Sequence, residues 1–350
     1  MRVGKLFYTL GSVLVALLPQ WLFADINSRK HDDQLMGPQY SHSLAFSPDG
    51  QYFVMAYEDK TIKLWDFSSG KRIRVFRGHT GAVVSVAFSP DGHYILSGGM
   101  DRVLKLWDTS SGKEIRTFKG HADSVVSVAF SSDRQYALSG SEDRNMKLWK
   151  IASGKEIGSF RGHEGYIGSV VAFSPDDPYL LMGKTLWDRS TGKEIRTFKS
   201  TGSDGYWKDS VKFSLNGKYV WIGETLLEVA TGEAVLVLTG LHGSTLHSIF
   251  AYSPDGSFVV SGGGSGNYGI TDFWNVSAFR AHDPADHSTA YLMPDTSMIS
   301  ERYPVTAIAI SPDSRFILVR TLYIAGSDTD TLTLWDVNNL DEPIRSFRAR

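Results

Sequence analysis

The sequence predicts an all-β fold in which seven four-stranded antiparallel sheets are arranged in a ring. The first observation is a five-residue phrase, in its fullest form Phe-Ser-Pro-Asp-Gly, whose copies begin at residues 46, 88, 130, 173, 213, 252 and 310. The copies are 42, 42, 43, 40, 39 and 58 residues apart, and a period of about 40 residues indicates an array of equivalent units. The second observation is that short apolar runs alternate with turn sequences inside each unit.

The unit is clearest in residues 80–121, where runs at 82–88, 94–97, 103–107 and 113–118 read as four strands. Turn sequences separate them: Ser-Pro-Asp-Gly, Gly-Gly-Met-Asp-Arg and Asp-Thr-Ser-Ser-Gly. Such a sheet has two apolar faces, and a radial stack of seven copies buries both. The expected blades, each with its innermost strand first, are 42–79, 80–121, 122–163, 164–200, 201–242, 243–282 and 305–350.

Two departures from the repeat are expected. Blades four and five are degenerate, because 13 positions separate Tyr136 from Trp149 but only eight separate Tyr179 from Trp187 and Tyr219 from Leu227. Both therefore lack five residues of the hairpin after the second strand. Residues 283–304 are interpreted as a loop inserted between blades six and seven.

The N-terminus is typical of a secretory signal peptide. Arg2 and Lys5 precede an apolar run over residues 6–18, and Ala24 precedes a polar stretch. We expect residues 1–24 to be cleaved and residues 25–41 to form a linker to the repeats at 42–350. This predicts a secreted or periplasmic protein. The alternative is a membrane anchor formed by residues 6–24, which nearly have the length of a membrane span.

Composition excludes several classes of function. The chain has 36 basic and 38 acidic side chains, so affinity for nucleic acid or anionic lipid is not implied. It has no cysteine, which excludes disulfides, thiolate nucleophiles and cysteine-ligated zinc. A nucleophile elbow, a His-Glu-x-x-His motif and a phosphate-binding loop are missing, and no cofactor is expected.

The set Gly78-His79, Ser97, Asp101 and Leu106-Trp107-Asp108 resembles the signature of WD-repeat β-propellers. The resemblance covers about residues 42–350 and is strongest in blades two and three. It implies that four side chains in each of these blades form an internal hydrogen-bonded chain, which we call a quartet. The quartets are His79, Ser97, Asp101 and Trp107, and His121, Ser139, Asp143 and Trp149.

A Ser-His-Asp hydrolase triad is the alternative interpretation of these residues. The structural interpretation is favoured, because four polar groups among apolar strands must satisfy one another and because catalytic triads do not normally occur in adjacent copies. The other blades keep only part of the set. They carry Trp65 with Asp59, His163 with Trp187, Ser261 with Trp274 and Ser265, and Trp335, while Leu227 replaces the tryptophan in blade five.

The rim that carries the Gly-His loops and the turns after the second strands, called the top face, is the expected binding surface. Tyr166, Tyr206 and Trp207 are on loops that enter the shortened blades, and aromatic residues on loops are favoured interaction anchors. Glu58, Met100 and Glu142 precede turn aspartates, a position that often contacts partners in the WD-repeat family. We expect a recess over blades four and five with these three residues on the opposite half.

Two further patterns have simpler explanations. His282, Asp283, Asp286 and His287 could bind a divalent metal, but the surrounding Pro and Ser content favours a loop, and no metal is expected. Basic residues recur on the outermost strands, where we expect their charge to discourage edge aggregation rather than to bind nucleic acid. They are Arg72, Arg74, Lys113, Arg116, Lys119, Lys193 and Arg196.

The favoured function is a non-catalytic scaffold, exported from the cytoplasm, that binds a protein or peptide on the top face. This functional interpretation rests on the resemblance to WD-repeat β-propellers, because a fold alone does not establish function. A hydrolase or lactonase that uses the central channel is the second hypothesis. A sensory or docking segment of a longer protein is the third.

Overall fold

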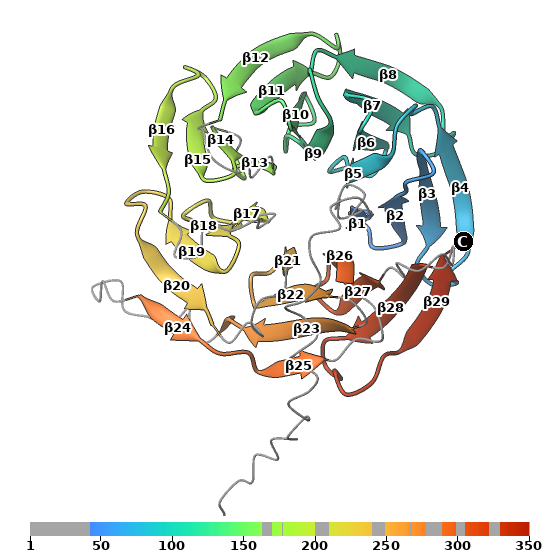
Figure 1. Ribbon diagram of the computed structural model, residues 1–350, viewed down its shortest axis with the longest axis vertical. Coiled ribbons are helices and arrows are strands. Elements are labelled where there is room, and N and C mark those ends of the chain that lie inside the picture. The colour runs from blue at the N-terminus through green and yellow to red at the C-terminus, as the bar shows by residue number, and fades with distance from the viewer. Residues whose placement is uncertain are drawn as a thin grey trace, which may run out of the picture. The chain divides into compact units, whose positions relative to one another are not determined.

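Seven sheets stand around a central axis, each with its first strand innermost and its last strand outermost (Figure 1). Their strands are antiparallel except for one parallel pair in blade five. The protein is therefore a seven-bladed β-propeller, and the described residues contain no α-helix. The computed structural model describes residues 43–162, 170–176, 178–199, 210–239, 249–265, 268–277, 289–298, 305–321 and 330–349.

Blades one to four each use four consecutive strands of the chain. Blade one contains β1 (Leu44–Phe46), β2 (Tyr52–Ala56), β3 (Thr61–Asp66) and β4 (Arg72–Arg77). Blade two contains β5 (Val83–Phe88), β6 (Tyr94–Gly99), β7 (Val103–Asp108) and β8 (Glu114–Lys119). Blade three contains β9 (Val125–Phe130), β10 (Tyr136–Ser141), β11 (Asn145–Lys150) and β12 (Glu156–Arg161). Blade four contains β13 (Val171–Phe173), β14 (Tyr179–Met182), β15 (Thr185–Asp188) and β16 (Glu194–Thr197).

Blades five and six share an exchange of strands. Blade five contains β17 (Val211–Phe213), β18 (Tyr219–Ile222), β19 (Thr225–Glu228), β20 (Ala234–Leu238) and the later strand β24 (Ala290–Leu292). Blade six contains β21 (Ile249–Tyr252), β22 (Phe258–Ser265), β23 (Tyr268–Asn275) and β25 (Thr296–Met298). Blade seven contains β26 (Val305–Ile310), β27 (Phe316–Thr321), β28 (Asp330–Asp336) and β29 (Arg345–Ala349).

The expected boundary of blade six at residue 282 is wrong, because its outermost strand is β25, inside the segment 283–304 that was interpreted as a loop. In the same segment, β24 pairs in parallel with β20 at the outer edge of blade five. The physical reason is the sequence of β20, Ala-Val-Leu-Val-Leu, which has no charge on an edge strand. An uncharged edge invites pairing, and β24 covers it.

The repeated phrase forms the bottom hairpin of each blade. Ser47 is buried, accepts a hydrogen bond from the Tyr52 amide at 2.9 Å and donates to Asp49. Gly50 has φ 70°, the left-handed conformation that glycine adopts without strain. The turn thus joins the first two strands by local bonds alone, which explains why the phrase predicts the hairpin so well.

Packing between blades is mainly aromatic and aliphatic. In every blade except blade five, a tryptophan on the third strand packs against the preceding blade, and Phe76 on β4 meets Trp107 of blade two edge-on at 5.9 Å. Phe118 with Trp149 and Phe160 with Trp187 repeat this contact at 5.7 and 5.6 Å. Buried aromatic residues bury large apolar areas and so contribute strongly to packing between blades.

Blade seven closes the ring on blade one by side-chain packing. All four strands of blade seven come from residues 305–349, and residues of both blades share one apolar cluster. Within it, Phe67 and Phe316 lie 5.5 Å apart, and buried Arg320 donates to the Ala56 carbonyl at 3.0 Å. The contact between blades one and seven therefore includes both apolar and hydrogen-bonded groups.

Arginines on outer strands connect neighbouring blades, which corrects their expected role. Arg116 and Arg196 do more than place positive charge on an edge strand, because their guanidinium groups reach the bottom turn of the next blade. The side chain of Arg74 likewise lies against Gly112, where a Cβ would be 2.7 Å from its Cδ. The bonds join Arg116 to Ala152 and Ser153, Arg196 to Ala230, and Arg345 to Ser68, at 2.7–3.2 Å.

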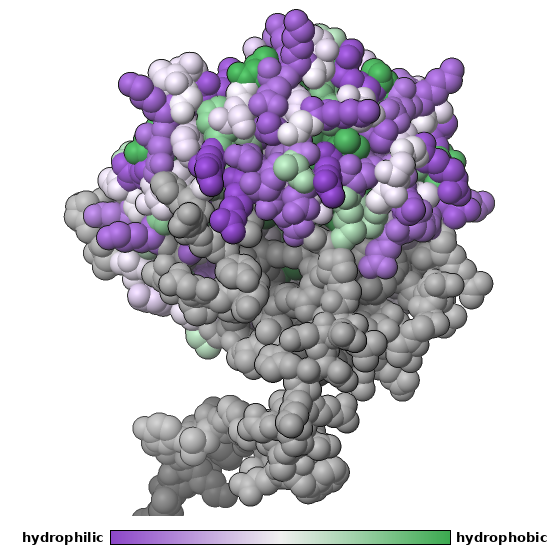
Figure 2. Space-filling model, turned by 45° about the horizontal axis from the view of Figure 1, so that its top comes forward, coloured by the Kyte–Doolittle hydropathy of each residue, from purple (hydrophilic) through white to green (hydrophobic). Residues whose placement is uncertain are grey.

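The outer side of the ring is mostly hydrophilic, with separate hydrophobic side chains (Figure 2). Five exposed isoleucines lie at equivalent positions in or beside the outer strands, and charged residues flank most of them. They are Ile73, Ile115, Ile157, Ile195 and Ile344.

Candidate functional site

The structure brings each predicted quartet together at the top of its blade. In blade two, Trp107 Nε1 donates to Ser97 Oγ at 2.8 Å, and Ser97 Oγ lies 2.7 Å from His79 Nε2. His79 Nδ1 lies 2.9 Å from the Asp101 carboxylate, which also accepts from the Thr80 amide at 2.8 Å. One chain of bonds thus joins the third strand, the second strand, the entering loop and the top hairpin.

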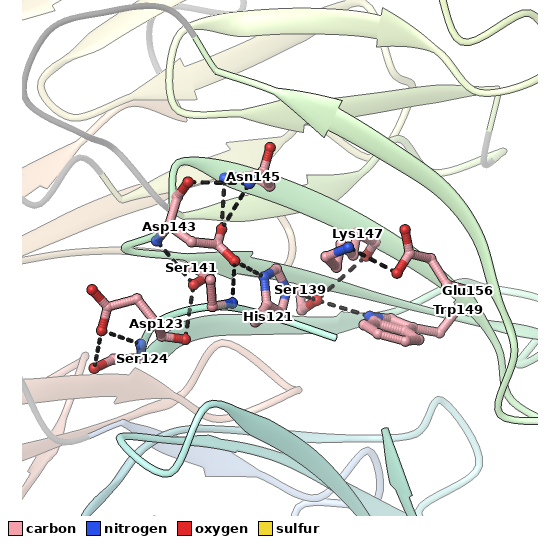
Figure 3. Close-up of polar contacts among 11 residues, drawn as sticks. His121, Asp123, Ser124, Ser139, Ser141, Asp143, Asn145, Lys147, Trp149 and Glu156 are labelled. Atoms are coloured by element: carbon pink, nitrogen blue, oxygen red, sulfur yellow. Dashed lines mark hydrogen bonds and ion pairs between the residues drawn. The ribbon is translucent and has the colours of Figure 1, made fainter. Parts of the chain in front are cut away.

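Blade three repeats this arrangement with His121, Ser139, Asp143 and Trp149 (Figure 3). The corresponding distances are 2.8 Å from Trp149 Nε1 to Ser139, 2.7 Å from Ser139 to His121, and 2.8 Å from His121 to Asp143. Beside each quartet, a lysine on the third strand pairs with a glutamate on the fourth. These ion pairs are Lys105–Glu114 and Lys147–Glu156, both 2.8 Å.

Ionisation in the quartets follows from burial and hydrogen bonding. Burial lowers the pKa of His121, against the opposing effect of Asp143, and thus favours the neutral ring. Burial alone would raise the pKa of Asp101 and of Asp143. Hydrogen bonds from the neighbouring histidines and backbone amides outweigh it and hold the pKa of both carboxyls below the usual range.

The hydrolase interpretation of the same residues fails on access. The Ser97 and Ser139 side chains are 0% exposed, and each hydroxyl is already bonded to an indole and an imidazole. A substrate carbonyl could not reach either oxygen without opening the blade. These two Ser-His-Asp sets are therefore structural elements that fix the top hairpins.

Other blades keep the tryptophan without its acceptor. Among the described residues, the indole nitrogens of Trp65, Trp187, Trp274 and Trp335 are buried and have no hydrogen-bond partner. In blade one, Met55 occupies the serine position opposite Lys63. Blade six retains Ser261 but its hydroxyl does not bond to Trp274, so that expected part of a quartet is present in sequence only.

The top hairpins of blades one, two and three carry Glu58, Met100 and Glu142 at equivalent positions. The amide of Met100 donates to Ala82 at 2.9 Å and that of Glu142 to Ser124 at 3.0 Å, so the loop of each blade holds its own hairpin. Glu58 is exposed, and Met100 and Glu142 are partly exposed. Two acidic side chains and one apolar side chain thus occupy equivalent positions on the top face.

Blades four and five are lower at the top than their neighbours. Two residues, Gly183 and Lys184, connect β14 to β15, and Gly223 and Glu224 connect β18 to β19. Tyr166, Tyr206 and Trp207, which were expected to line a recess there, lie outside the described residues. The structure thus supports the shortening but leaves their positions undescribed.

Within the described ranges, no group of three or more His, Asp or Glu side chains could hold a metal ion. His282, Asp283, Asp286 and His287 lie outside these ranges. No helix in the described part of the chain is long and apolar enough to span a membrane, and residues 6–24 are outside it.

Sequence reasoning missed contacts on the innermost strands. Ser85 Oγ accepts from the Val128 amide of the next blade at 3.1 Å, and Ser127 Oγ does the same for Val171. Lys212 was also missed: it donates to the Tyr252 carbonyl at 2.9 Å, and burial lowers its pKa. A signal for it exists, because the residue before the phrase is alanine in the other six blades (45, 87, 129, 172, 251 and 309).

Five segments of the chain match one sequence family, described as WD40: WD domain, G-beta repeat. The matched residues are 35–66, 70–108, 112–150, 154–191 and 297–336, more than half of the chain. The middle three matches each begin before an outermost strand; two end on the third strand of the next blade and the other ends three residues after it. The last begins within β25, in agreement with the place of β25 at the outer edge of blade six.

Proposed function

Because this chain belongs to the WD-repeat family, whose propellers are generally protein-interaction scaffolds and typically not enzymes, we propose that it binds a protein or peptide on its top face. The proposed contact residues are Glu58, Met100 and Glu142 on blades one to three. Tyr166, Tyr206 and Trp207 would contact the partner on the part of the top face over the shortened blades four and five. We expect no cofactor or metal to take part in this binding.

The observation that carries the proposal is the rigid presentation of the top hairpins of blades two and three. The quartets and the loop bonds fix the hairpin backbone of blades two and three, while the residue before the aspartate remains accessible. A preorganised surface loses little conformational entropy on binding. Variation of this one residue between glutamate and methionine can therefore set specificity without a change in the fold.

The test uses matched substitutions on opposite rims. Glu58→Gln, Met100→Ala and Glu142→Gln alter the top face, while Gln51→Ala, His93→Ala and Gln135→Ala alter exposed positions of the bottom hairpins in the same blades. Crosslinking and affinity capture from the native compartment should lose the partner only in the top-face variant. Loss in neither variant, with both folded, would contradict the proposal.

The recess is tested separately by Tyr166→Ala, Tyr206→Ala and Trp207→Ala. Capture should weaken if these aromatic side chains contact the partner. Unchanged capture by a folded variant would limit the binding surface to blades one to three.

We also propose that the protein acts outside the cytoplasm, secreted or periplasmic. Support comes from Arg2, Lys5 and the apolar run at 6–18. N-terminal sequencing of the protein from its native source should find a chain that begins near residue 25. An intact N-terminus in a membrane fraction would indicate the anchor alternative instead.

A further inference from the structure

The top rim of blades one to three carries a row of basic side chains outside the three residues of the proposed binding surface. Each blade contributes two: one at the end of the top hairpin and one at the end of the outermost strand, in adjacent register. All are exposed. This outer basic row consists of Lys60, Arg77, Arg102, Lys119, Arg144 and Arg161.

No hydrogen bond or ion pair joins these six side chains to another residue in the described ranges. They differ in this from the third-strand lysines of the same blades, Lys63, Lys105 and Lys147, which pair with acids, and from Arg116, which bonds to backbone carbonyls. Blade four continues the row with exposed Lys199. The positive charge of the rim is therefore available to a partner.

The backbone at three of these positions adds a second observation. Lys60, Arg102 and Arg144 have φ of 68°, 67° and 67°, a left-handed conformation that is unfavourable for residues with a side chain. At the matching place in the bottom hairpins, blades one and two use Gly50 and Gly92, and blade three uses Arg134 with φ 61°. All three top hairpins thus carry an exposed basic side chain at a position where glycine would relieve strain, whereas only one of the three bottom hairpins does.

The charge pattern across the rim restricts the kind of partner. The order of residues in a hairpin places Glu58 and Glu142 on the axis side of the outer basic row, because they follow the second strand and the basic residues precede the third. A phosphate backbone or an anionic membrane presents uniform negative charge, which this acidic inner side would repel. A protein segment can place acids over the outer row and neutral or basic groups over the inner one.

We propose that the outer basic row binds an acidic segment of the protein partner, laid along the rim from blade one toward blade three. This inference rests on the proposed function and specifies its partner. The net charge of −2 agrees with it, because the row is balanced by acids elsewhere and does not make the protein a general binder of polyanions.

The experiment measures anisotropy of a labelled peptide of alternating glutamate and serine, with full-length protein, at low and at physiological salt. The test variant combines Lys60→Asn, Arg102→Asn and Arg144→Asn, since asparagine tolerates the left-handed conformation. The control variant combines Lys71→Asn, Lys113→Asn and Lys155→Asn, which removes the same charge from exposed bottom turns. A single-stranded DNA of equal charge and vesicles containing phosphatidylserine are parallel probes.

We expect the test variant to bind the peptide about tenfold more weakly and the control variant to bind it like the native protein. Higher salt should weaken native binding. Equal losses in the two variants, an absence of peptide binding, or tighter binding of DNA or vesicles than of peptide would overturn the inference. If Met100→Ala abolishes partner capture while any of these results is obtained, the proposed binding on the top face is retained. Only the proposal that the partner contributes an acidic segment is then rejected.

Discussion

The guanidinium of Arg345 donates a hydrogen bond to the main-chain carbonyl of Ser68, 277 residues earlier in the chain. Arg116 makes the equivalent hydrogen bond between blades two and three, and Arg196 makes it between blades four and five. The Arg345 bond is therefore one copy of a cross-blade contact placed at the point where the ring closes. No strand need be exchanged for the ring to gain this bond.

We predict that Arg345→Ala weakens the closing contact. Loss of one hydrogen bond should lower the free energy of unfolding by about 0.5–1.5 kcal/mol. Hydrogen exchange should increase first in β1 and β29, measured by mass spectrometry. Arg77→Ala is the control, since its exposed side chain has no partner among the described residues. Equal effects of the two substitutions would contradict a closing role for Arg345.

Ser97→Ala should destabilise blade two more than Ser261→Ala destabilises blade six. The first change leaves the buried Trp107 N–H without an acceptor and His79 without a donor, at a cost of about 1–3 kcal/mol. The Ser261 hydroxyl has no such role, because Trp274 is already unpaired. Urea unfolding measures the free energy of unfolding of both variants. Similar losses in the two variants would show that the hydrogen-bonded chain does not stabilise blade two.

Stability should fall as the pH is lowered, in two ranges. The pKa of His121 is lower in the folded protein, so the unfolded chain binds its proton first and stability declines below about pH 6.5. The carboxyls of Asp101 and Asp143 also have lowered pKa values, so their contribution is lost below about pH 3.9.

The His121→Gln variant tests the first range. Its free energy of unfolding should depend less steeply on pH between pH 8 and pH 5 than that of the native protein, whatever its absolute value. Parallel pH profiles would assign the dependence to other histidines.

Leu292→Asp should uncover the edge of blade five. Leu292 packs on the apolar cluster beneath β24, so a carboxylate there should detach the strand and expose the uncharged edge of β20. We expect self-association on size-exclusion chromatography with light scattering. Tyr291→Asp is the control, because that side chain is 67% exposed on the same strand. A monomeric Leu292→Asp protein would argue against the protective role of β24.

Regular blades were predictable because their hairpins form locally. Ser47, Asp49 and Gly50 close their turn with bonds inside five or six residues, so the phrase carries its own structure wherever it recurs. The quartets were predictable for a related reason, since the four residue types complement one another and stand at fixed spacings within one blade. Neither sequence pattern predicts which molecule binds Glu58, Met100 and Glu142 on the top face.

The outer strand of blade six was not predictable in the same way. Its third strand ends at Asn275, and the next strand in sequence, β24, pairs with blade five instead. The choice depends on the uncharged edge of β20, which becomes a pairing surface only once blade five is folded. Residues 283–304 contain turn residues and no copy of the repeated phrase, so their sequence alone predicts a loop.

By itself the sequence determined the number of blades, the order of strands within the regular ones and the composition of both quartets, because each depends on residues close together in the chain. Only the tertiary structure decided which edge accepts β24, which arginines reach the next blade and how blade seven meets blade one. Those contacts join residues as far apart as Ser68 and Arg345, and their geometry exists only after the sheets have packed into a ring.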